Sequence, residues 1–432
     1  MAENKTMNRW LVVLGAILIQ LSLGAIYAWS VFTPPLKAAG WTNLETQVVF
    51  SLGLASFAVV MVWAGRRLSD WGPRKLACTG GVVLGVSYVL AGLFGGTHFW
   101  SVNLLIGLLG GAGIGLGYVV PIAVGMRWFP DKKGMITGLA VAGFGFGAMA
   151  WVKLAGEWGH LLANYGLSTT FIVYGVIFAG LVLIGGIWMV FPPPGWKPEG
   201  YVAPQASTGA TNGTVPFTSR AMLATPQFYL IFLTYTISAG AGLMSIGLMK
   251  LYPMEALQAT GISQAEASAI AGTAMAVFFS LANGIGRIMW GTFSDWLGRR
   301  RSILIMAGTQ GLILLAFPFM AGQEYLLYLG AMLIGFNFGG NFALFPTMTA
   351  DTFGTETVGQ NYPYVFLAYG VGGIVGPILG GMLGDMGNFP VAFTITGVAC
   401  IVAAAMIYKV SPVRARQANP SVDGLGIAGR AS

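Results

Sequence analysis

The stretch GRRLSDWGPRK at residues 65–75 has a counterpart, GTFSDWLGRR, at residues 291–300. Each copy places two glycines seven residues apart, with an acid between them and a basic cluster behind. Glycine permits a tight turn between two helices, while Asp beside a helix N-terminus and Arg beside a C-terminus both suit the helix dipoles. A single copy would be typical of any basic loop in a membrane protein. Recurrence at matching positions indicates an internal repeat of two halves.

Long apolar stretches flank both copies. Of the 432 residues, 56% are hydrophobic and 8% are charged, whereas a soluble chain carries about 25% charged residues. This composition excludes a water-soluble enzyme and a disordered chain. A transmembrane helix needs about 20 apolar residues, and twelve charge-poor stretches of that length lie six on each side of the polar segment 200–219. We predict an all-α membrane protein with twelve transmembrane helices in two pseudo-symmetric six-helix bundles, residues 1–192 and 226–410.

The basic residues predict the orientation. All 22 Lys and Arg residues except Lys37, Lys153, Lys250 and Arg287 fall on one side of the twelve-span arrangement. The positive-inside rule places this side, with both termini, in the cytoplasm, and the protein in the cytoplasmic membrane. The net charge of +8 therefore needs no nucleic-acid partner. The first span is too long for a cleaved signal peptide. The Pro- and Ser/Thr-rich residues 193–225 predict a flexible cytoplasmic linker, and residues 411–432 a cytoplasmic tail.

The sequence contains no pattern typical of an enzyme. There is no phosphate loop, metal-binding cluster or nucleophile with a base, and glycine-rich strings lie within spans rather than between a strand and a helix. Cys78 and Cys400 lie in apolar runs, where buried thiols are expected. We therefore expect no catalytic residue, metal or cofactor.

This repeat of spans and loops resembles the major facilitator superfamily, whose loop reads Gly-x3-Asp-x2-Gly-Arg. The second copy matches, whereas the first has Ser69 where the family has Asp, with Asp70 one place later. The resemblance implies that both loops take part in gating. The implied gating residues are Gly65, Asp70, Gly72, Arg74, Gly291, Asp295, Gly298 and Arg299.

Further motifs resemble the oxalate/formate antiporter branch and the related monocarboxylate transporters. They are GAIYAWS at 24–30, RWFPDKKG at 127–134, TPQF at 225–228, ALFP at 343–346 and NY at 361–362. The matches cover the whole chain, and they are more specific for the branch than for the substrate. They imply a secondary transporter that works by alternating access.

Arg287 is the one charge deep inside a span. Such an arginine costs roughly 2.5–3.5 kcal/mol on insertion scales, which marks it as a functional candidate. The alternative is that it snorkels toward the loop at Gly291, about 6 Å away along the helix. The resemblance favours function, since related carriers place a substrate-binding arginine here. Asn283 shares its helix face and stands where monocarboxylate carriers have an Asp implicated in proton coupling.

The resemblance also implies a cavity lined by aromatic residues. Oxalate carriers use a second cation, a lysine in the eleventh span, and the matching residue here is Tyr369. A dianion would leave one carboxylate unpaired at low dielectric, so one positive charge favours a monoanion. Lipid contact or bundle packing is the alternative role for any single aromatic residue. The implied cavity residues are Tyr27, Tyr118, Phe144, Phe338 and Phe342.

We therefore expect a transporter of a small monocarboxylate such as lactate, pyruvate, formate or glycolate. Coupling to a proton and coupling to a counter-substrate both stay open, because no acid lies deep in a span. An oxalate/formate antiporter is the alternative within this class. A membrane receptor of the same fold is the alternative outside it, although neither the linker nor the tail is long enough for a signalling domain. We expect a monomer in the lipid bilayer.

Overall fold

The described chain is built from helices. The computed structural model describes residues 7–41, 43–156, 158–198, 201, 217–249 and 251–410, and these contain no strand. Twelve helices in this part of the chain are long and apolar enough to cross a membrane. The predicted helical class and the predicted number of spans are both confirmed.

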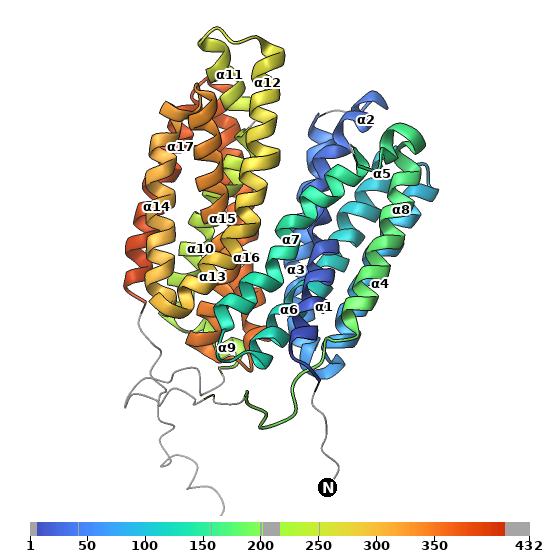
Figure 1. The fold of residues 1–432 in the computed structure, drawn as a ribbon, viewed down its shortest axis with the longest axis vertical. Coiled ribbons are helices and arrows are strands. Elements are labelled where there is room, and N and C mark those ends of the chain that lie inside the picture. Colours follow the sequence, from blue (N-terminus) through green and yellow to red (C-terminus); the bar gives the residue numbers. More distant parts are fainter. Residues whose placement is uncertain are drawn as a thin grey trace, which may run out of the picture.

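The spans form two bundles of six (Figure 1). The N-terminal bundle comprises α1 (Trp10–Leu23) with η1 (Gly24–Val31), α3 (Asn43–Trp71), α4 (Pro73–Leu93), α5 (Phe99–Val102) with η2 (Asn103–Gly110) and α6 (Gly111–Trp128), α7 (Lys133–Ala155) and α8 (Leu161–Gly186). The C-terminal bundle comprises α10 (Pro226–Leu248), α12 (Gln264–Thr273) with η3 (Ala274–Phe279) and α13 (Ser280–Leu297), α14 (Arg299–Met320), α15 (Glu324–Phe353), α16 (Val358–Asp385) and α17 (Phe389–Tyr408). Short helices α2 (Thr33–Ala38), α9 (Ser219–Leu223) and α11 (Leu251–Ala259) lie outside the spans.

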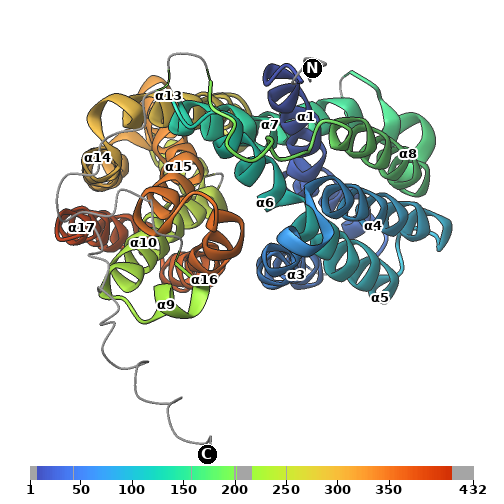
Figure 2. The same ribbon diagram turned by 90° about the horizontal axis from the view of Figure 1, so that it is seen from below.

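The two bundles meet at one end and diverge toward the other (Figure 1). We call the meeting end the basic end, because it carries the loops around residues 66–75, 127–133 and 299–301. Two helix pairs make the main contacts between the bundles: α7 with α13, and α3 with α16 (Figure 2). Since each pair joins one helix from each half, the contacts follow the pseudo-symmetry of the sequence repeat.

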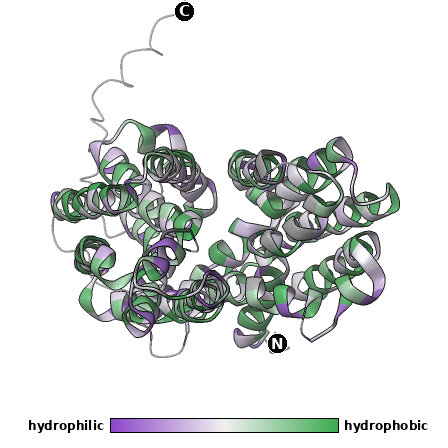
Figure 3. Cartoon of the chain, turned by 90° about the horizontal axis from the view of Figure 1, so that it is seen from above, coloured by the Kyte–Doolittle hydropathy of each residue, from purple (hydrophilic) through white to green (hydrophobic). Residues whose placement is uncertain are grey.

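Hydrophobic residues, in green, are spread along the helices of both bundles (Figure 3). Large apolar side chains such as Leu93, Val176 and Phe319 are exposed on the surface. In water such a surface would be unfavourable, whereas in a bilayer it faces hydrocarbon.

Apolar residues anchor the two ends of the predicted linker. The Trp196 ring lies 4.7 Å from that of Trp128, and the amide of Phe217 donates to the Phe353 carbonyl. Met222 in α9 is fully buried. Residues 199–200 and 202–216 of this linker, the tail 411–432 and Lys250 lie outside the described residues, and the side chain of Lys37 is not described either.

Candidate functional site

Arg287 lies in α13 with its side chain fully buried, at 0% exposure, which snorkelling would not produce. Its Nε donates to Asn283 Oδ1 at 3.0 Å, and its Nη1 donates to the Val141 carbonyl of α7, also at 3.0 Å. Its Nη2 is buried without a hydrogen-bond partner. No acidic side chain among the described residues forms an ion pair with it. The guanidinium therefore keeps the two N–H groups of Nη2 and its full charge for a ligand.

Two phenylalanines, one from each half, contact this guanidinium. Its carbon lies 4.0 Å from the ring centre of Phe342 in α15 and 5.6 Å from that of Phe144 in α7. Ring faces attract a cation and exclude water from it. Phe338, one turn before Phe342, lies edge to face with that ring at 5.3 Å.

Three tyrosines extend the site across both halves. The rings of Tyr27 and Tyr118 lie 5.1 and 5.3 Å from Phe144. The Tyr27 hydroxyl bonds that of Tyr369 at 2.5 Å, and the Tyr369 ring lies 5.4 Å from Phe342. The structure thus brings together all eight residues expected to line the cavity. That they bind a substrate stays a prediction.

Close backbone packing positions Arg287 against the opposite half. A Cβ at Gly138 of α7 would collide with the carbonyl of Arg287, and one at Gly291 would collide with the carbonyl of Gly134. Only glycine permits these approaches. The close crossing of α7 and α13 therefore requires glycine at positions 138 and 291. It puts the Arg287 guanidinium within reach of the Val141 carbonyl.

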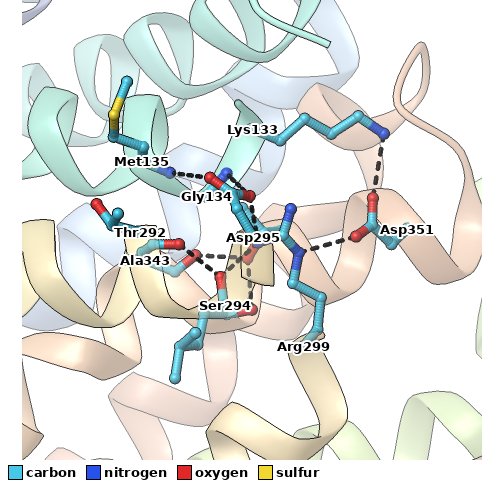
Figure 4. Close-up of polar contacts among 12 residues, drawn as sticks. Lys133, Gly134, Met135, Thr292, Ser294, Asp295, Arg299, Ala343 and Asp351 are labelled. Carbon is cyan, nitrogen blue, oxygen red and sulfur yellow. Dashed lines mark hydrogen bonds and ion pairs between the residues drawn. The ribbon is translucent and has the colours of Figure 1, made fainter. Parts of the chain in front are cut away.

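At the basic end, the second repeat loop contacts the opposite half through Asp295 (Figure 4). Asp295 Oδ1 accepts from the Gly134 amide at 2.9 Å, and Oδ2 from the Met135 amide at 2.8 Å. These amides lie in the first turn of α7, where backbone donors have no partner within the helix and attract an anion.

Ion pairs hold this carboxylate in place (Figure 4). Arg299 Nη1 lies 2.7 Å from Asp295 Oδ1, and Arg299 Nε lies 2.9 Å from Asp351 Oδ2. Lys133 Nζ of the opposite half lies 3.1 Å from Asp351 Oδ1. We call Lys133, Asp295, Arg299 and Asp351, with the two α7 amides, the latch.

The first repeat loop forms no equivalent of the latch. Its Asp70 is exposed and pairs within its own helix, with Arg67 at 3.6 Å. Ser69, in the place of the family Asp, accepts a bond from Gln360 Nε2 of α16 at 3.3 Å. Arg66 of this loop donates to the Tyr364 hydroxyl of α16, so the first copy contacts the other half through a cation and neutral groups, whereas the second copy does so through a carboxylate.

The glycines of the two loops retain matching conformations. Gly72 and Gly298 end their spans at φ values of +75° and +84°, which favour glycine. Gly65 faces the carbonyl of Gly359 in α16 with no room for a Cβ, as Gly291 faces Gly134. Arg74 instead bonds within its own half, to the Ile187 carbonyl at 2.5 Å.

Sequence reasoning missed several residues of these contacts. Asp351 and Lys133 were not assigned to the latch, because nothing in the sequence pairs two residues from separate halves. Tyr235, which is fully buried, was not singled out, and Tyr362 was noted only as part of the NY motif and not as a site residue. Their signal in the sequence, one tyrosine in an apolar span, is shared by many packing residues.

Twelve spans in two matching bundles, with a buried cation between them and paired loops at one end, define a membrane transporter. The family model described as Major Facilitator Superfamily matches residues 12–277 and 232–428. The chain belongs to that superfamily.

Curated relatives cover nearly the whole chain. The oxalate:formate antiporter of Oxalobacter formigenes is 27% identical, over 96% of this chain and 94% of its own. The uncharacterized MFS-type transporter YhjX of Escherichia coli is 27% identical, over 86% and 87%. Monocarboxylate transporter 13 of Rattus norvegicus is 24% identical, over 90% and 85%.

A solved transporter shares the fold. The crystal structure of the major facilitator superfamily transporter FucP in the outward conformation has a TM-score of 0.67 and 16% identity, and the match covers 92% of this chain and 97% of that one.

Proposed function

We propose that this protein transports a small monocarboxylate across the cytoplasmic membrane by alternating access. The observation that carries the proposal is the buried guanidinium of Arg287, which has no acidic partner among the described side chains and whose Nη2 has no hydrogen-bond partner. A buried charge without a counter-charge is costly, and a bound carboxylate would supply that counter-charge. An arginine fork suits the planar geometry of a carboxylate.

The proposal includes a topology and a division of the chain. Residues 1–192 and 226–410 form the two moving halves, residues 193–225 link them, and the basic end and both termini face the cytoplasm. The positive-inside rule supports this orientation. In the conformation described, the latch then closes the cytoplasmic side. The protein acts as a monomer.

Uptake into proteoliposomes tests the proposal. Labelled lactate, pyruvate, formate, glycolate and oxalate are supplied with and without an inward proton gradient, and with and without an internal anion. We expect saturable uptake of at least one monocarboxylate. Stimulation by the gradient would assign proton coupling, and stimulation by the internal anion would assign exchange. Uptake of none of these acids would contradict the proposal.

Oxalate/formate exchange is the second candidate function. It is favoured by the named activity of the Oxalobacter formigenes relative, which matches 96% of this chain. Against it, Tyr369 supplies a hydroxyl bonded to Tyr27 where a second cation would be needed.

Replacing Tyr369 with lysine is expected to increase inhibition by oxalate of monocarboxylate uptake. The new ammonium would lie near Phe342, on which the Arg287 guanidinium also packs, and would pair the second carboxylate. The inhibition constant for oxalate should fall about tenfold, the equivalent of ~1.4 kcal/mol. Tyr369→Phe is the matched control, since it also breaks the bond to Tyr27 but adds no charge. Equal oxalate inhibition in both folded variants would show that this position does not face the substrate.

Replacing Asn283 with aspartate is expected to make transport strongly pH-dependent. Asn283 Oδ1 already accepts from Arg287 Nε. A carboxylate there would pair with the guanidinium at high pH and exclude the substrate anion, and it would be neutralised at low pH. In the unaltered protein, any proton dependence should follow the substrate's own protonation. Initial uptake rates measured against pH check this.

Asn337→Asp is the control for that variant. Asn337 is also buried in the C-terminal half, but its amide group bonds Trp290 and Thr309 instead of Arg287. Superimposed pH profiles of Asn283→Asp and the unaltered protein would place Asn283 away from the working face of Arg287.

A further inference from the structure

A cavity of about 930 Å³ lies at the basic end, and none of its lining residues belongs to the site around Arg287. The N-terminal half contributes Arg127 and Lys133 to its wall, and the C-terminal half contributes Arg299 with the loop between α15 and α16. The remaining wall is the segment after α8, which runs from the N-terminal bundle toward the C-terminal one (Figure 2). Because both halves line it, the cavity keeps this shape only while they meet at the basic end.

Two basic side chains of this cavity have no carboxylate partner. Lys133 and Arg299 pair with Asp351 as part of the latch. No ion pair joins Arg127 or Lys197 to a carboxylate in the described part of the chain. Lys133 also uses only one of its three N–H groups in its pair. Cations gathered in a concave site concentrate a multivalent anion from solution, so we expect the ligand to carry several negative charges.

Arg127 bridges the segment after α8 and the opposite half. Its guanidinium carbon lies 3.8 Å from the ring centre of Phe191, and its Nη2 donates to the Glu356 carbonyl at 2.5 Å. Its Nε is buried and has no hydrogen-bond partner. Glu356 also lines the cavity, but it is exposed and forms no ion pair there. The guanidinium therefore keeps donor capacity for a phosphate, whose oxygens an arginine fork fits.

The segment after α8 adds apolar and aromatic surface to the cavity. Residues 192–194 are prolines, and Trp196 is fixed by its ring contact with Trp128 at 4.7 Å. Tyr201 completes this wall, and its ring contacts no other aromatic ring among the described residues. An aromatic face without a partner is a platform for a planar ring of a ligand. The cavity thus combines groups that bind phosphates with a surface that suits a base.

We infer that this cavity binds a nucleoside phosphate, with its phosphates among the four basic side chains and its base on Tyr201. A volume of about 930 Å³ lies in the range of roughly 300–1,000 Å³ that is typical of small-molecule sites, and it is larger than a small monocarboxylate needs. Binding joins cations of the N-terminal half to Arg299 of the C-terminal half, so it stabilises the state in which the halves meet. The ligand therefore holds the basic end closed and slows transport. This effect on transport rests on the proposed function, whereas the binding itself does not.

The test measures equilibrium binding of labelled ATP to the purified protein in detergent. Lys197→Gln removes one unpaired charge, and Tyr201→Ala removes the platform for the base. Lys75→Gln is the matched control, because Lys75 is an exposed lysine at the basic end that does not line the cavity. Adenosine and tripolyphosphate serve as competitors, since each carries only one of the two features that the cavity recognises. Thermal unfolding of each variant checks that it is folded.

We expect saturable binding of ATP that weakens about tenfold, equal to ~1.4 kcal/mol, in Lys197→Gln and in Tyr201→Ala, and that is unchanged in Lys75→Gln. Each competitor should displace labelled ATP less effectively than unlabelled ATP does, because it makes only part of the contacts. Absence of binding, equal affinities in all three variants, or competition by tripolyphosphate as strong as by ATP would overturn the inference.

A second measurement follows the effect of binding on the basic end. Spin labels at positions 75 and 301, one on each half, report the distance across this end. In Asp295→Asn, which removes the ion pair with Arg299, saturating ATP should shift the distance distribution to shorter values. Binding without this shift would overturn the hold on the basic end. Neither measurement needs a transported substrate, so a failure of monocarboxylate uptake would contradict the proposed function alone, and a failure of ATP binding would contradict this inference alone.

Discussion

Arg287→Lys is expected to raise the half-saturating concentration for monocarboxylate uptake by about 10- to 100-fold. Lysine keeps the positive charge but loses the planar fork, and with it one of the two bonds that a carboxylate can receive. A single lysine ammonium also cannot replace both bonds that Arg287 now makes, from Nε to Asn283 and from Nη1 to the Val141 carbonyl. A hydrogen bond to a charged group contributes about 1.5–3 kcal/mol, which gives the expected range.

The control for this change is Arg300→Lys. Arg300 is exposed at the basic end of the same half and bonds the Val410 carbonyl, so the same chemical substitution there should leave uptake unchanged. Initial rates over a range of substrate concentrations are compared for both variants. Unchanged kinetics in Arg287→Lys would mean that the buried guanidinium serves the packing of α13 on α7 and not the substrate.

Asp295→Asn is expected to open the basic end. The amide keeps the shape of the side chain but loses the ion pair with Arg299, and its NH₂ group would face one of the two α7 amides that the carboxylate now binds. Bonds to an ionised acceptor are about twice as strong as neutral ones. A loss of about 1.5–3 kcal/mol shifts the ratio of closed to open conformations by about 10- to 100-fold.

Spin labels at the basic end measure this shift. Lys75→Cys and Arg301→Cys place one label on each half at exposed positions, in a chain whose Cys78 and Cys400 are replaced by alanine. The distance distribution should move to longer values in Asp295→Asn. Asp70→Asn is the matched control from the first repeat loop, and it should leave the distribution unchanged because Asp70 pairs only within its own half. Equal shifts in both variants would contradict the inference that only the second repeat loop forms a latch between the halves.

The sequence was sufficient for the architecture, for a physical reason. Crossing a bilayer demands about 20 apolar residues per helix, so hydropathy alone located the twelve spans. The loop repeat then divided them into halves. Arg287 was equally visible, because a charge at depth stands out in an apolar helix.

The contacts between the halves could not be predicted from the sequence in the same way. The latch joins Asp295 to amides of α7 and Arg299 to Asp351, and helix periodicity says nothing about which helices cross. The absence of a latch in the first copy was foreshadowed by Ser69 in the place of the family Asp. The full burial of Tyr235 is a property of the assembled bundle, and the sequence does not distinguish it from any other tyrosine in an apolar span.

The meeting of Arg287 and Gly138 has a mechanical consequence. The helical turn that presents the guanidinium is also the turn whose backbone presses on the opposite half. In the terms of a lever, the proposed anchor for the anion sits at the fulcrum, and the points of greatest travel are the distant ends of the helices. In the proposed alternating access, a rocking of the halves about this crossing would move the guanidinium less than it moves the distant helix ends. An anion bound there, as proposed, would stay close to this crossing while the barriers on either side of it open and close in turn.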